Sequence, residues 1–228
     1  MNKSATGYFV LAFQKDAVAF IELKQCGTLI QAMHWDKEPQ DINFLEKCGR
    51  ELVHKTVVTN DMDAYVNFVQ KATEKGLSMF SKRMLRSKVW FIHNELQYRL
   101  KLPTTLSILE KLFLYGVSPS THENEAMATA LNYYQLIQCY LFDTAKNQQI
   151  ASCTLEQNYA NAFSKLSIEA LLQHVEHVPL QLQLTSNLGK IQCDIHIDNQ
   201  IFSYESHTAH QSIASALAQY YSSLHENP

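Results

Sequence analysis

The first 35 residues alternate between short apolar runs and polar breaks, a pattern typical of β-strands joined by tight turns. Three runs are rich in branched and aromatic residues: GYFVLAFQ (7–14), AVAFIELK (17–24) and TLIQAMHW (28–35). Lys15–Asp16 and Gln25–Gly27 separate them as turns. The start of the chain therefore predicts a three-stranded antiparallel meander.

Helical patterns dominate the next part of the chain. Asp41 and Asp61 each precede an amphipathic segment, as helix N-caps do, and His54–Thr59 between them fits a short strand. Residues 77–100 are mostly helical in pattern, although Val89–Ile92 also fits a buried strand. This region is therefore expected to be mainly helical.

A long helix is expected to end at about Phe142. Ser120 and Glu123 have the spacing of a capping box, in which each side chain satisfies the other residue's free backbone N–H. The polar stretch Lys146–Gln149 then predicts a break.

Residues 165–228 have the most regular pattern. A helix opening at Ser167 precedes three alternating strands, and a last helix runs from about His207 to Leu224. The strands are expected at 180–185, 191–198 and 200–206. The whole chain thus predicts an α+β fold: an N-terminal antiparallel β-meander followed by a helical region (1–164), then a C-terminal α-β-β-β-α module (165–228).

Composition supports a soluble globular protein. The chain has 228 residues, 46% of them apolar and 18% charged, and no apolar stretch approaches the length of about 18 residues that spans a bilayer. Its five cysteines are scattered and include no C-x-x-C pair, which disfavours a disulfide framework. We therefore expect a cytoplasmic protein without membrane insertion.

The net charge of −3 conceals an uneven distribution. Residues 71–111 hold nine basic and three acidic residues (+6), whereas residues 112–228 hold three basic and ten acidic residues (−7). One segment therefore suits anionic partners, and the long C-terminal part repels them.

The α-β-β-β-α order of residues 165–224 resembles a double-stranded RNA-binding domain. The last helix carries the resemblance best, in the spacing of Ile213, Ala216, Leu217 and Tyr220. Members of that family bind phosphates with a lysine cluster at the start of this helix, where this chain has Ala209–His210–Gln211.

The charge of this module opposes RNA binding. From Leu166 to Pro228 the net charge is −5, and phosphate neutralisation supplies most of the affinity for a duplex. The resemblance therefore implies a module that retains the fold and docks protein, with nucleic acid an unsuitable ligand; an unrelated helix-and-sheet layer remains the alternative.

The N-terminal part resembles the ribonuclease H-like folds in the order of its elements. Val57–Asp61 is similar to that family's fourth strand with its carboxylate turn, and Thr121–Glu125 to the segment before its last helix. Two-metal hydrolysis requires several carboxylates, yet Gly7–Gln14 contains no acid and Ala128 stands where an acid is expected. The resemblance therefore implies the fold without its hydrolytic activity.

A histidine group is the best metal candidate in the sequence. His174 and His177 are three residues apart, as are His207 and His210, and His196 lies on a strand between them. Amphipathic histidines near helix ends explain the same pattern. We therefore assign no metal, cofactor or catalytic residue from the sequence, in which no phosphate-binding loop, dinucleotide fingerprint or nucleophile elbow occurs.

The leading hypothesis is a non-catalytic protein-interaction protein, an adaptor or accessory subunit of a multiprotein complex such as a bacterial secretion assembly. The alternative is a nucleic-acid-binding protein that uses the basic segment 71–101, where cations are interleaved with aromatic residues. That segment can instead pair with the acidic C-terminal half. The candidate partner-binding residues are Lys82, Arg83, Arg86, Lys88, Trp90, Tyr220 and Tyr221.

Overall fold

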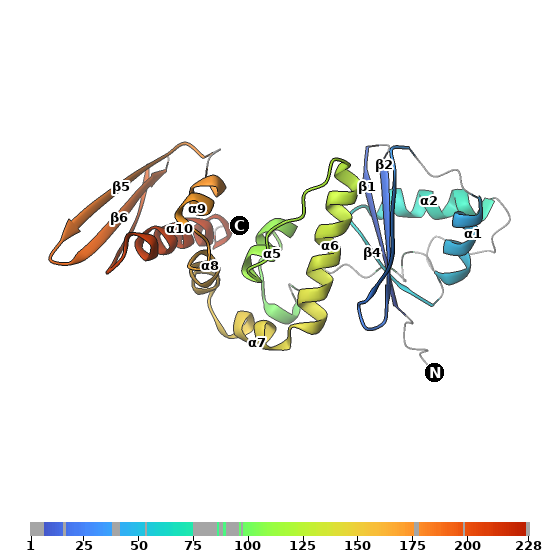
Figure 1. The fold of residues 1–228 in the computed structure, drawn as a ribbon, viewed down its shortest axis with the longest axis horizontal. Coiled ribbons are helices and arrows are strands. Elements are labelled where there is room, and N and C mark those ends of the chain that lie inside the picture. Colours follow the sequence, from blue (N-terminus) through green and yellow to red (C-terminus); the bar gives the residue numbers. More distant parts are fainter. Residues whose placement is uncertain are drawn as a thin grey trace. The chain divides into compact units, whose positions relative to one another are not determined.

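The computed structural model describes residues 7–15, 17–37, 42–52, 54–74, 86, 89, 96, 98–175, 178–197 and 199–226. The fold is α+β, as the sequence predicts (Figure 1). Contacts group the chain into two compact units, Met1–Leu96 with Pro119–Asp143, and Gln97–Ser118 with Thr144–Pro228. The boundary expected after residue 164 falls inside the second unit.

The first unit contains a four-stranded sheet. Strands β1 (Gly7–Gln14), β2 (Ala17–Lys24) and β3 (Leu29–Trp35) pair antiparallel, which confirms the predicted meander. Strand β4 (Thr56–Thr59) pairs parallel to β1 and gives the strand order β3-β2-β1-β4. An isolated parallel bridge joins Val89 to Val57 of β4.

Helices cover both faces of this sheet. Helices α1 (Ile42–Glu51) and α2 (Met62–Glu74) lie on one side, and α6 (Glu125–Phe142) lies on the other (Figure 1). Because helices cover both faces of β1 and β2, these two strands are nearly continuous apolar runs, whereas the edge strand β3 exposes Leu29 and Ile30. The core beneath α1 and α2 includes Phe9, Leu11, Val18, Phe20, Phe44, Cys48, Leu52, Val57, Tyr65, Val66, Phe68 and Val69.

Side-chain hydrogen bonds to the backbone determine where α2 and α6 begin. The Asp61 side chain accepts hydrogen bonds from the backbone N–H groups of Asp63 and Ala64, which confirms it as the cap of α2. The capping box expected at Ser120 is wrong, because Asn124 caps α6 and accepts from the Met127 N–H. The Ser120 N–H instead donates to the Asn132 side chain, so this residue stays in the preceding loop.

The second unit combines short helices with the C-terminal sheet. Its helices are α5 (Ile108–Leu114), α7 (Thr144–Ser152), α8 (Leu155–Phe163), α9 (Ile168–His174) and α10 (Ala209–Glu226). The polar stretch expected as a break, Lys146–Gln149, is therefore helical. Strands β5 (Leu180–Asn187), β6 (Lys190–Ile197) and β7 (Gln200–Ser206) form an antiparallel sheet, which confirms the predicted module.

Helix α10 covers one face of the second sheet. It packs against β6 and β7, with Ile213 and Leu217 buried on the helix and Cys193 and Ile195 buried on β6 (Figure 1). The opposite face is polar, because the strands alternate between apolar and polar residues. This sheet is therefore packed on one side only.

Candidate functional site

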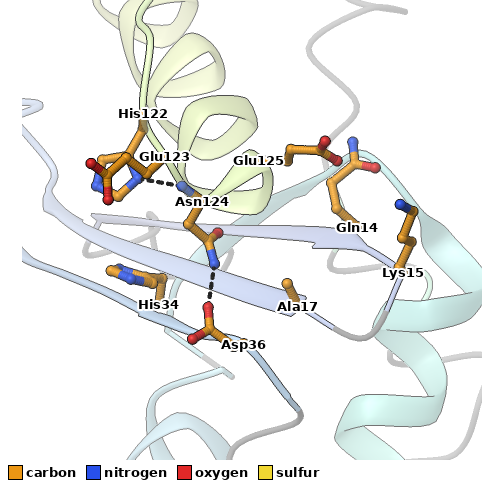
Figure 2. Close-up of a pocket in the computed structure, with 9 residues that line it drawn as sticks. All are labelled: Gln14, Lys15, Ala17, His34, Asp36, His122, Glu123, Asn124 and Glu125. Carbon is orange, nitrogen blue, oxygen red and sulfur yellow. Dashed lines mark hydrogen bonds between the residues drawn. The ribbon is translucent and has the colours of Figure 1, made fainter.

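An open cleft of about 780 Å³ in the first unit is the candidate site. Figure 2 shows its lining, which comes from three separate segments. The β1–β2 hairpin contributes Gln14, Lys15 and Ala17, the end of β3 contributes His34 and Asp36, and the start of α6 contributes His122, Glu123, Asn124 and Glu125.

Asn124 connects two of these segments. Its Nδ2 donates a hydrogen bond of 2.9 Å to Oδ1 of Asp36, so it ties the α6 start to the end of β3 (Figure 2). Its side-chain oxygen simultaneously caps α6 by accepting from the Met127 N–H at 3.0 Å. A second link is the 3.4 Å bond from Gln14 Nε2 to Thr129 Oγ1. The cleft geometry thus depends on the same residue that begins the helix.

Two histidines face each other across the cleft. The rings of His34 and His122 have centroids 5.2 Å apart and meet edge to face at 71°. The backbone N–H of Asn124 donates to Nδ1 of His122 at 3.0 Å, so Nδ1 is an acceptor and the neutral ring carries its proton on Nε2. The Nε2–H of His122 is then a hydrogen-bond donor.

The cleft has an excess of negative charge. The lining contains three carboxylates, those of Asp36, Glu123 and Glu125, and one ammonium group, that of Lys15. None of the three carboxylates takes part in an ion pair with any residue that the structure describes. Glu125 lies in the first turn of α6, where the helix dipole favours an anion and offsets part of its charge. The cleft therefore suits a cationic or hydrogen-bond-donating group.

The sequence did not single out this cleft. Its residues range from Gln14 to Glu125, the Asn124–Asp36 bond joins residues 88 positions apart, and they form no contiguous motif. In the sequence, Thr121–Glu125 is distinguished only by its resemblance to the ribonuclease H-like segment. Asn124, which directly precedes a helical pattern, is the local signal that marks the observed start of α6.

Of the predicted partner-binding residues in the basic segment, the structure describes only Arg86. Lys82, Arg83, Lys88 and Trp90 lie outside the described residues. Arg86 forms an exposed ion pair with Asp63, with 2.8 Å between guanidinium Nη2 and carboxylate Oδ1. The binding role of this basic segment stays a prediction.

Tyr220 and Tyr221 are half-buried on α10 within an aromatic cluster. The Tyr220 ring lies 5.6 Å from Phe202, and the Tyr221 ring lies 5.6 Å from Tyr159 and 5.4 Å from Phe163. These contacts give both tyrosines a role in packing the second unit, and their predicted role in partner binding stays a prediction.

Two histidines of the C-terminal module, His196 and His210, lie on opposite sides of the second sheet. His196 lies on the polar face of β6, whereas α10, which carries His210, packs on the other face. His210 Nε2 is 2.6 Å from the Leu166 carbonyl oxygen, and His177 lies outside the described residues. Across the described part of the chain, no group of three or more His, Cys, Asp or Glu side chains is arranged to hold a metal ion.

A second polar cluster fixes the end of α10 to α5. His225 Nε2 is 2.8 Å from Oε1 of Glu110, and Nδ1 of the same ring is 2.8 Å from Oγ1 of Thr105. Glu110 also accepts from the Ser107 N–H, which completes the capping box of α5. Burial raises the pKa of the Glu110 carboxyl, but the hydrogen bonds from Ser107 and His225 outweigh it, so this pKa is lowered. The cluster joins two helices of the second unit.

In comparisons with known proteins, no family model matches the chain and no curated protein matches it significantly. None of the helices in the described residues is long and apolar enough to cross a bilayer. The five cysteines are all free thiols.

Proposed function

We propose that this chain is a non-catalytic protein-interaction protein, a cytoplasmic adaptor or accessory subunit, that binds a basic polypeptide segment in the cleft of its first unit. The observation that carries the proposal is that three carboxylates around one open cleft form no ion pair with any residue that the structure describes. Arginine and lysine side chains carry the complementary charge, and arginine matches a carboxylate in a bidentate geometry.

The shape of the cleft supports an extended ligand. Most of its lining side chains are exposed, so the cleft opens broadly to solvent. Its polar groups include donors as well as acceptors, such as Lys15 and the Nε2–H of His122. A polypeptide presents both kinds of partner along its backbone and side chains, which suits such a lining.

The fold-level resemblances belong to the same proposal. The strand order β3-β2-β1-β4, with β4 parallel to β1, supports a ribonuclease H-like fold for the first unit. The order α9-β5-β6-β7-α10 supports a double-stranded-RNA-binding-domain-like fold for the C-terminal module. Both resemblances concern the fold, and function is argued from the site.

The test measures binding of a short fluorescein-labelled peptide of alternating arginine and serine to the full chain by fluorescence anisotropy. We expect saturable binding that weakens as salt increases, because exposed charges are screened. The double variant Glu123→Gln/Glu125→Gln removes two of the three carboxylates and should weaken binding about tenfold, equivalent to roughly 1.4 kcal/mol.

The matched control is Glu156→Gln/Glu169→Gln. Each glutamate lies in the first turn of a helix outside the cleft, α8 and α9, so the control also removes two carboxylates. It should leave the peptide affinity unchanged. Equal weakening by the control and the cleft variant, or equal affinity for a glutamate–serine peptide, would reject the cleft as the binding site.

The nucleic-acid alternative has its own signature. Retention of RNA or DNA by the chain at physiological salt, lost in the variant Arg83→Glu/Arg86→Glu, would favour binding through residues 71–101. Arg86 already neutralises Asp63, so part of this segment's positive charge is compensated within the chain.

A further inference from the structure

The outer edge of β5 is an unprotected strand edge. In the strand order β5-β6-β7, β5 is terminal, and no strand in the described residues pairs with its outer side. Its eight residues, LQLQLTSN, contain no charge and no proline, and its register with β6 is unbroken over the whole strand. Natural proteins usually protect such edges with charges, prolines or bulges, since an open ladder of N–H and C=O groups recruits another strand.

The edge strands β3 and β7 carry such protection, and the edge strand β4 has only four residues, with an isolated bridge from Val89 to its Val57. Strand β3 has a register shift opposite Glu22 and Leu23, a β-bulge-type irregularity. Strand β7 carries Glu205, which pairs with Lys190 on β6. Strand β5 therefore differs from the other edge strands, because it is long and regular and has no charged residue.

The leucines of β5 also lack full cover. Helix α10 packs against β6 and β7, and the side chains of Leu180 and Leu182 are only half-buried. Leu184 is 44% exposed. A strand added beside β5 would place side chains next to these leucines on the same face of the sheet.

We propose that β5 pairs antiparallel with β5 of a second copy of this chain, forming a continuous six-stranded sheet across a two-fold axis. The strand is self-complementary, because facing residues in an antiparallel pair point to the same side of the sheet. A register centred on Leu182 pairs Leu180 with Leu184 of the second copy, and Gln181 with Gln183 of the second copy. Leucines then meet leucines on the α10 side, and glutamines meet glutamines on the polar side.

The charge of β5 favours a second copy over a different partner. The strand is neutral, so two copies bring no repulsion into the new ladder, and a charged partner strand would find no opposite charge on β5. A two-fold axis perpendicular to the sheet also closes the assembly at two copies, because the β5 edge of each copy is then paired with that of the other. The acidic cleft belongs to the other unit, so this proposal stands independently of the proposed function.

The test uses two charge variants of the full chain in sedimentation equilibrium. The variant Gln181→Lys/Gln183→Lys places lysine directly opposite lysine at both glutamine pairs of the dimer and should weaken dimerisation about tenfold or more. The variant Gln181→Glu/Gln183→Lys places glutamate opposite lysine in the same two pairs and should restore or strengthen the dimer. Both changes lie on the exposed polar face, where Asp194 of β6 stands beside residue 183, so circular dichroism should show the wild-type fold.

Several results would overturn the proposal. These are a wild-type chain that stays monomeric at every concentration, equal dimer affinity of the two charge variants, or growth into open-ended aggregates in place of a closed dimer. Equimolar mixing of the double-lysine variant with Gln181→Glu/Gln183→Glu should produce a heterodimer. A mixture that stays monomeric would likewise contradict the antiparallel register.

Discussion

The two sheets of this protein differ in the surroundings of their charged side chains. The first is covered on both faces, and its one buried acid, Glu22 on β2, has a side chain only 4% exposed. The second is covered on one face, and Glu205 on β7 has a side chain 47% exposed. The difference shows that a charge is tolerated inside the first sheet only because the surrounding elements supply counter-charges, whereas the second leaves its charges in water.

Glu22 sits in a network built from three elements. Lys55 and Lys47 donate to its two carboxylate oxygens at 3.0 and 2.8 Å, and Gln31 on β3 donates to it at 2.8 Å. Lys55 is itself nearly buried and lies over the Phe9 ring, 5.3 Å from its centroid. Removing Glu22 therefore leaves the nearly buried Lys55 with only the more distant carboxylate of Glu51, 3.8 Å away, as a counter-charge.

The largest expected effect follows from this network. Glu22→Ala should destabilise the first unit by about 3 kcal/mol or more, because it leaves the buried Lys55 ammonium without its main counter-charge. Asp194→Ala on the open face of β6 should cost less than about 1 kcal/mol. Trp35 lies on β3 of the first unit, so urea unfolding followed by tryptophan fluorescence in a Trp90→Phe background reports that unit selectively.

The contrasting Asp194 variant makes the comparison decisive. Asp194 accepts hydrogen bonds from Gln192 and Ser203, and water can replace it as the partner of both. Asp194 lies in the second unit, so the stability of its variant is measured by urea unfolding followed by far-UV circular dichroism, and the midpoint should shift little. Similar losses of stability for the two variants would show that solvent exposure does not separate the two sheets.

The hairpin turns give the second comparison. Gly27 after β2 and Gly189 between β5 and β6 have nearly equal φ angles, +81° and +78°, which favour glycine. A methyl group at Gly27 would overlap the Phe142 ring, whereas none of the atoms around Gly189 lies within 4 Å of such a methyl group. Gly189→Ala should cost about 1 kcal/mol from backbone strain alone, and Gly27→Ala about 1–3 kcal/mol more from overpacking.

Thermal unfolding of each glycine variant measures this difference. The Gln138 side chain donates to the Gly27 carbonyl at 2.7 Å, so a shift of the turn also disturbs α6. Equal effects of the two substitutions would mean that the Phe142 ring moves aside without cost, and would leave backbone strain as the only common cause.

The third expected effect is a pH dependence. Burial raises the pKa of the Glu22 carboxyl, but hydrogen bonds and charge interactions with Lys47 and Lys55 outweigh it, so this pKa is lower in the folded chain than the ordinary 4.5. A lowered pKa gives stability that is fully present above pH 4.5 and is lost as the pH falls through the folded value.

Urea midpoints of the wild type and Glu22→Gln should therefore converge as the pH falls below 4.5. Tryptophan fluorescence again reports the first unit alone. A gap between the two proteins that stays constant across this range would show that the carboxylate of Glu22 contributes nothing through its charge. The conservative amide keeps the shape of the side chain, so the comparison isolates ionisation.

The sequence predicts these two sheets unequally well. The alternation of apolar and polar residues in β5–β7 indicates a sheet with one solvent-exposed face. The long apolar runs of β1 and β2 agree with strands that are covered on both faces. The role of Glu22 within its run cannot be read locally, because Lys47 and Lys55 lie 25 and 33 positions further along the chain.

The cleft and the α6 start were missed for related reasons. Ser120 and Asn124 are both good N-cap residues, and only the long-range bond from Ser120 to Asn132 decides between them. Asn124 also reaches Asp36, a pairing that depends on how α6 lies against the sheet. Periodic patterns predict elements, whereas contacts between distant elements need the packed structure.

The smallest expected effect is at the exposed ion pair of the second sheet. Lys190 Nζ lies 2.6 Å from Glu205 Oε1, but the two side chains are 53% and 47% exposed. Water screens the attraction, and ordering two long side chains opposes it, so Lys190→Gln should change the far-UV circular dichroism melting temperature by no more than its experimental error. Lys55→Gln removes the same kind of group from the same kind of partner in a buried setting, and should lower stability clearly. A measurable loss of stability in Lys190→Gln would mean that this ion pair is screened less than its exposed fraction indicates. The charged side chains of the two sheets would then differ less than the comparison predicts.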